Sequence, residues 1–136
     1  MAVLKILLLT FIVFAGSSLW FSKLFGKTWM KIHHNKDKTP EEMKQDRKNR
    51  WKLMLTEFIL TLVITTNLFF IASSTNSLSV VLVVTVILWL GFVLPTTVSN
   101  TIWGNDEKKW MIKKIAISSG YRLIAMLFTA WILFIW

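Results

Sequence analysis

The chain has 136 residues, of which 54% are hydrophobic and 14% aromatic, and its formal net charge is +9. A mean hydropathy of +0.57 is too high for an ordinary soluble domain, and the length excludes two domains of typical size. The absence of cysteine excludes disulfides, thiolate metal sites and cysteine nucleophiles.

The first apolar segment runs from Ala2 to about Phe21 and is long enough to cross the roughly 30 Å hydrocarbon core of a bilayer as a helix. Its one charge, Lys5, lies near the end, where a long side chain reaches the headgroups. Small residues around Ala15 also resemble the cleavage site of a secretory signal. We expect the segment to be kept as a first span over residues 2–21.

Residues 22–52 form a basic connection that contains ten of the 16 Lys and Arg residues. At its start, apolar and aromatic residues alternate with Lys23, Lys27 and Lys31, which predicts a short helix in the membrane interface with these lysines near anionic headgroups. His33 and His34, with Asp37 nearby, could be considered metal ligands. Neighbouring side chains on a helix point about 100° apart and lack the usual ligand spacing, so we expect no metal site.

The second long helix is predicted to begin at Thr39. The sequence Thr39-Pro40-Glu41-Glu42 places a capping oxygen, a proline at the first helical position and a glutamate at the third. We expect this helix to pass through a charged stretch, enter the membrane near Trp51 and form a second span over residues 53–73.

The third span follows from the 48 uncharged residues between Glu57 and Asp106. As one helix this run would rise about 72 Å, so it must cross the bilayer, turn at the polar residues 73–77 and cross back. The third span is placed at residues 78–98, where Pro95 should kink or end the helix. A fourth span is placed at residues 112–136. The expected fold is an all-α integral membrane bundle of four helices in one domain, residues 1–136.

The orientation follows from the cations, since 14 Lys and Arg residues lie in the first and third connections. The positive-inside rule places these connections in the cytoplasm and both termini outside. Five tryptophans fall at the same interface, where indole sits between lipid and water: Trp20, Trp29, Trp51, Trp103 and Trp110. Membrane lipids with anionic headgroups, rather than nucleic acid, explain the net positive charge.

Two ionisable residues lie inside the spans at similar depth. Glu57 is about 9 Å of helix rise past Trp51, and Arg122 is about 10 Å past Ile115. An unpaired charge there costs at least about 3 kcal/mol, so we expect an ion pair inside the bundle. The pair could line a proton or solute path, or only join two helices. Asn67 and Tyr121 could add polar packing between helices.

The sequence holds no Gly-rich phosphate loop, no nucleophile elbow and no clustered carboxylates within the spans. We therefore expect neither an enzyme nor a cofactor. A weak internal similarity links Gly16 and residues 29–32 with Gly91 and residues 110–113, which suggests that the bundle consists of two parallel helix hairpins.

Three motifs resemble a known family. The stretches Leu19-Trp20-Phe21-Ser22 and Leu24-Phe25-Gly26-Lys27-Thr28-Trp29-Met30, then Trp89-Leu90-Gly91-Phe92-Val93-Leu94-Pro95, and finally Gly120-Tyr121 are similar, in that order, to motifs of the small membrane proteins catalogued as domain of unknown function 1761. Ser22-Lys23 departs from them, because the family usually has a small residue and proline there. The resemblance implies four spans and a prokaryotic cell membrane, and it brings no known reaction.

Two kinds of function remain open from the sequence. The first is a non-catalytic accessory or structural subunit, bound to other membrane proteins or to itself, which suits the small size and the abundance of apolar residues. The second is a small dimeric transporter or channel in which Glu57 and Arg122 belong to a polar path.

Overall fold

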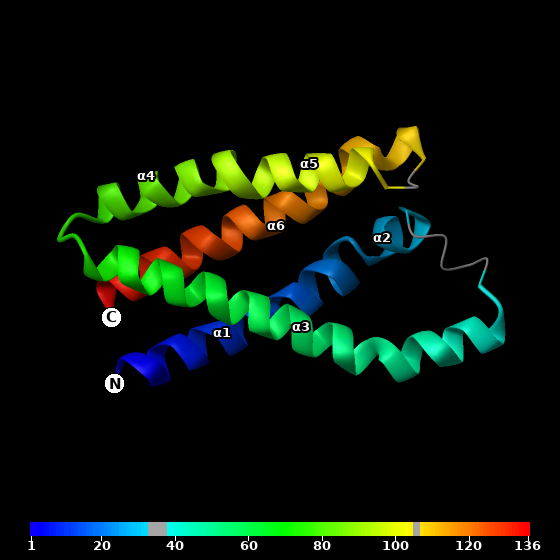
Figure 1. Cartoon of the computed structure of the whole chain (residues 1–136), viewed down its shortest axis with the longest axis horizontal. Coiled ribbons are helices and arrows are strands. Elements are labelled where there is room, and N and C mark those ends of the chain that lie inside the picture. Colours follow the sequence, from blue (N-terminus) through cyan, green and yellow to red (C-terminus); the bar gives the residue numbers. More distant parts are fainter. Residues whose placement is uncertain (33–37, 105–106) are drawn as a thin grey trace.

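The computed structural model describes residues 1–32, 38–104 and 107–136, and in these ranges the regular structure is helical without strands (Figure 1). The elements in chain order are α1 (Ala2–Leu19), the π-helix η1 (Trp20–Leu24), α2 (Gly26–Ile32), α3 (Pro40–Ser73), α4 (Leu78–Leu88), the π-helix η2 (Trp89–Val93), α5 (Leu94–Ile102) and α6 (Lys108–Ile135).

Within the described ranges, four segments are long and apolar enough to cross a membrane: Ala2–Leu24, Pro40–Ser73, Leu78–Ile102 and Lys108–Ile135. They form the all-α membrane bundle that the sequence predicts, and α2 is the expected short helix after the first span. The first and third helical segments extend a few residues beyond the predicted spans, because each continues through a π-helical turn.

The spans alternate in direction. Figure 1 shows both termini and the turn between α3 and α4 at one end of the bundle, with α2 and the connection from α5 to α6 at the other. α3 and α6 pack against each other in the middle, while α1 packs mainly on α3 and α4 mainly on α6. The two hairpins therefore meet along their second helices.

The start of α3 is the capping box that the sequence predicts. The Thr39 hydroxyl accepts a hydrogen bond from the Glu42 N–H at 3.3 Å, and the Glu42 carboxylate accepts one from the Thr39 N–H at 2.8 Å. Pro40 occupies the first helical position, where its missing N–H is not needed. One helix of 34 residues thus contains both the charged stretch and the second span.

Pro95 is the second residue of α5, and α5 follows η2 directly. Proline cannot donate a backbone hydrogen bond, and its ring crowds the carbonyl four residues earlier, which belongs to Gly91. The π-helical turn at Trp89–Val93 coincides with that carbonyl and accommodates the crowding. The helix then continues to Ile102 rather than ending at the proline.

The buried apolar core lies in the half of the bundle that contains the termini. Its members come from all four spans: Leu9, Leu68, Ala72, Val81, Met126, Ala130 and Leu133. Many large apolar side chains on the outer faces are exposed, among them Phe11, Val83 and Phe92. This is expected of a membrane bundle, because lipid tails are as apolar as these side chains.

Candidate functional site

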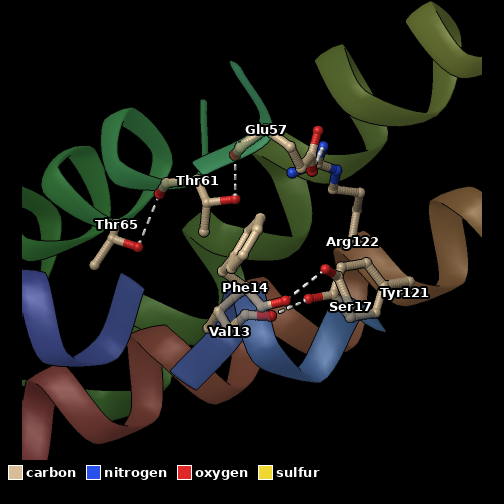
Figure 2. A network of polar contacts seen from close by, with 8 residues as sticks. All are labelled: Val13, Phe14, Ser17, Glu57, Thr61, Thr65, Tyr121 and Arg122. Atoms are coloured by element: carbon tan, nitrogen blue, oxygen red, sulfur yellow. Dashed lines mark hydrogen bonds and ion pairs between the residues drawn. The ribbon is translucent and has the colours of Figure 1, made fainter. Parts of the chain in front are cut away.

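Glu57 on α3 and Arg122 on α6 form the ion pair that joins the two central helices (Figure 2). Arg122 Nη2 lies 2.6 Å from Glu57 Oε1. The Glu57 side chain is 37% exposed and that of Arg122 is 26% exposed, so neither is sealed within the packing. The pair neutralises two charges at a depth where each alone would be costly.

A cavity of about 640 Å³, here called the polar cleft, opens around this pair. All four spans line it, and it lies in the half of the bundle nearer the basic connections. Its polar lining, besides the ion pair, consists of Ser17, Thr96, Thr97, Asn100, Ser118 and Tyr121. The volume falls in the range of small-molecule sites. On the other side, the apolar core closes the bundle.

Tyr121 is fixed beside Arg122 by contacts with the first span. Its hydroxyl donates a hydrogen bond to the Val13 carbonyl at 2.5 Å (Figure 2). Its ring centroid lies 5.6 Å from that of Phe21. Ser17, one turn further along α1, donates to the Phe14 carbonyl of its own helix at 2.6 Å. Tyr121 thus provides the polar packing between helices that the sequence suggests.

The threonines of α3 and Asn67 bond within their own helix instead. Thr61 donates to the Glu57 carbonyl at 2.8 Å and Thr65 to the Thr61 carbonyl at 2.9 Å, as Figure 2 shows. Asn67 is exposed and donates to the Val63 carbonyl at 2.8 Å. Local bonds of this kind allow a hydroxyl or an amide to lie in an apolar environment without a partner on another helix.

Two tryptophans hold α6 from opposite hairpins. Trp20 Nε1 donates to the Ile117 carbonyl at 3.1 Å, and Trp89 Nε1 donates to the Ser119 carbonyl at 2.8 Å. Each tryptophan is the first residue of a π-helix. The sequence does not predict this arrangement: an indole N–H within an apolar span needs an acceptor, but the residues do not indicate which acceptor it finds.

The remaining predicted interface residues lie around the basic end. Trp51 and Trp103 are exposed, and Trp29 lines the mouth of the polar cleft. The ring of Trp110 lies 5.7 Å from Lys109 Nζ and 5.0 Å from Lys113 Nζ. Lys23, Lys27 and Lys31 are exposed on η1 and α2. Their contact with lipid headgroups stays a prediction.

The residues considered as metal ligands, His33, His34 and Asp37, lie outside the described residues. Within ranges 1–32, 38–104 and 107–136, no group of three or more His, Cys, Asp or Glu side chains could hold a metal ion.

A family model described as "protein of unknown function (DUF1761)" matches residues 4–134, which is nearly the whole chain. No curated protein and no solved structure matches the chain.

Proposed function

The chain belongs to the DUF1761 family, whose members are described as proteins of unknown function, and from its geometry we propose that it is a small, non-catalytic membrane carrier. Its ligand binds in the polar cleft, where Glu57 and Arg122 recognise a polar or charged group.

The partial exposure of the ion pair within the cleft carries this proposal. A pair that only joined two helices would be best sealed by packing, because water and exposure weaken the attraction between charges. Here both side chains line the same cavity, beside neutral hydrogen-bonding groups such as Thr97 and Ser118. Intramembrane ionisable residues that face a cavity are typical of ligand and ion paths.

The lining of the cleft supports a binding role rather than a catalytic one. Among the described residues that line the cleft, Glu57 is the one carboxylate, and it is paired with Arg122. A guanidinium does not give up its proton in proteins, and no serine of the lining has a histidine or second acid beside it there. The side chains are suited to hold a ligand, not to exchange its protons.

The arrangement of charge supports an orientation. The basic residues of α2, α3 and the start of α6 lie at the end of the bundle near the cleft (Figure 1). By the positive-inside rule this end faces the cytoplasm of a prokaryotic cell, with both termini outside. The cleft then opens to the cytoplasmic side. Four spans are few for a complete solute path, so transport requires a dimer in this proposal.

Cysteine labelling tests the cleft directly, because the natural chain contains no cysteine. Ser118→Cys places a thiol on the cleft wall, and Val83→Cys places one on the exposed apolar face of α4. A charged methanethiosulfonate applied to inside-out vesicles should modify the first and leave the second unmodified, since the thiolate forms only in water. If Ser118→Cys stayed unmodified while Trp103→Cys, at an exposed position of the basic end outside the cleft, reacted, the proposal would be wrong.

A second candidate is an accessory subunit of a larger membrane complex, or a homo-oligomer. It is favoured by the third span, Leu78–Ile102. Only 11% of the apolar stretch of this span is buried, so the span presents a long apolar face. Small four-span proteins can use such a face to pack on partners. Extraction in a mild detergent followed by mass measurement tests this, and a stable solitary monomer would contradict it.

A further inference from the structure

A second open space lies beside the polar cleft, between the first and second spans. This groove of about 970 Å³, here called the side groove, is lined by residues of α1, η1, α2 and α3. It shares Ser17, Phe21, Trp29 and Glu57 with the cleft, so the two spaces adjoin along these four residues.

The helix packing explains why this groove exists on one side only. In the second hairpin α5 packs along α6 and covers it. In the first hairpin the corresponding segment turns after η1, and α2 contacts α6 instead. Among the described residues, nothing equivalent to α5 packs along the first half of α3, so Leu53, Met54 and Thr56 border an open groove.

Beside the side groove, along the same turns of α3, lies an open apolar furrow of about 620 Å³. Phe14 and Met54 line both spaces, and the furrow is completed by Phe11, Trp51, Leu55 and Phe58. All six of these side chains are apolar or aromatic. The lining residues are thus charged at the ion pair, partly polar in the side groove, where they include serines, and apolar or aromatic in the furrow.

The charge along this route favours an anion. Arg50 lines the side groove and Arg122 lines the cleft beside it, while Glu57 is the one acid among the described residues that line either space. Since Arg122 already neutralises Glu57, Arg50 gives the described lining of the two spaces a net positive charge. Arginine is well suited to bind phosphate through parallel hydrogen bonds.

We propose that the side groove binds a membrane lipid with an anionic phosphate headgroup. The headgroup lies near Arg50 and Ser22, and an acyl chain lies in the apolar furrow. This inference rests on the proposed function, because it makes a lipid the ligand of the carrier. A water-soluble ligand would gain nothing from contact with the apolar side chains of the furrow. An amphiphile can place its apolar chain in the furrow and its charged headgroup near Arg50.

Photocrosslinking in vesicles tests the proposal. The photoreactive amino acid p-benzoylphenylalanine replaces Met54 in the groove or, as a matched control, Leu60 on the same helix outside it; their side chains are 46% and 48% exposed. The vesicles contain equal amounts of phosphatidylcholine and phosphatidylglycerol, and mass spectrometry identifies the crosslinked lipid. We expect phosphatidylglycerol to predominate at position 54 and both lipids to crosslink equally at position 60.

The Arg50 variants show whether the headgroup is recognised. Arg50→Gln should lower the preference for phosphatidylglycerol at position 54 about fivefold, the effect expected of one lipid-facing cation, and Arg50→Lys should largely keep it. Equal crosslinking of both lipids at position 54, or a preference unchanged in Arg50→Gln, would overturn the proposal and leave only ordinary surrounding lipid.

The cysteine experiment separates this inference from the carrier proposal. If Ser118→Cys is modified but position 54 shows no lipid preference, the ligand is not an anionic lipid and the carrier proposal stands. If Ser118→Cys is unreactive, the carrier proposal fails whatever the lipid result.

Discussion

Glu57 and Arg122 stabilise each other as a pair, so removing one should cost more than removing both. We expect Glu57→Gln or Arg122→Gln to lower the free energy of unfolding by about 2 kcal/mol, less than a fully buried pair would lose because both side chains are partly exposed. The double variant should lose less free energy of unfolding than either single variant.

Unfolding by steric trapping in bicelles can measure this double-mutant cycle. Additive losses would mean that the pair contributes no coupling energy. Substitution of Asn67 by Ala is the matched control, because this polar side chain is exposed and bonds only its own helix.

The indole hydrogen bonds of Trp20 and Trp89 should each contribute a measurable part of the stability of α6. Phenylalanine keeps an aromatic side chain, although a smaller one, and removes the N–H donor, so Trp20→Phe and Trp89→Phe should each cost about 0.6 to 1.5 kcal/mol. Trp51→Phe, at an exposed position, should cost little in the same unfolding measurement. An equal loss at Trp51 would show that ring size, not the hydrogen bond, is responsible.

At the residue scale, the ion pair could be predicted and the tryptophan bonds could not. Glu57 and Arg122 are charges at matching depth within spans, and an apolar solvent leaves them few alternatives to pairing. Tryptophan suits both a membrane interface and a buried site with an acceptor. The sequence therefore does not distinguish the inward-bonded Trp20 from the exposed Trp103.

The capping box at the start of α3 should control the order of the helix's first turns. Thr39→Ala removes the hydroxyl that accepts from the Glu42 N–H, which should cost about 1 kcal/mol of local stability. Hydrogen exchange of the amides in the first turn of α3 should accelerate, whereas exchange around Thr65 should not change. Equal acceleration in both regions would indicate a global effect.

The same cap should respond to acid. Hydrogen bonds from the backbone N–H and hydroxyl of Thr39 lower the pKa of Glu42, because they favour its charged form. A carboxyl whose pKa is lowered by folding contributes stability that is complete above its ordinary pKa and is lost as the pH falls through the lowered value. Faster exchange at the start of α3 should appear in that acidic window, and Glu42→Gln should abolish this pH dependence.

At the element scale, periodicity predicts the helices but not the faces they present after a π-helical turn. Each such turn inserts about one extra residue and rotates the following positions by about 100°. Thr96, Thr97 and Asn100 therefore face the cleft although the third span contains no obvious polar stripe. Pro95 indicates the irregularity in this span, whereas nothing in the residues around Ser22 indicates η1.

At the scale of the molecule, the basic connections lie at one end of the bundle. In single-cysteine variants Lys44→Cys and Lys108→Cys should react with an impermeant reagent from the same side of the membrane, and Asn76→Cys from the opposite side. Vesicles of defined orientation make this test. Reaction of positions 44 and 108 from opposite sides would contradict the proposed orientation.

The two hairpins match each other in the closed half and differ at the cleft. Arg122 follows Glu57 by 65 residues, and the buried residues Met126, Ala130 and Leu133 follow the buried Thr61, Thr65 and Leu68 by the same interval. The match ends at the open half, where Tyr121 is buried but its counterpart Thr56 is exposed. The constant interval reflects the parallel packing of α3 and α6 at one depth, and the difference between them lies at the side groove.

The two indole bonds join α6 to the first and third spans at one level, and the Arg122–Glu57 pair joins it to α3. The charged front of α3 reaches about 26 Å from Pro40 to Glu57. This charged part of α3 projects towards the basic end. Because α3 is one continuous helix, a neighbouring protein that binds the charged part would displace Glu57, and it would open or close the cleft without contact with the ligand.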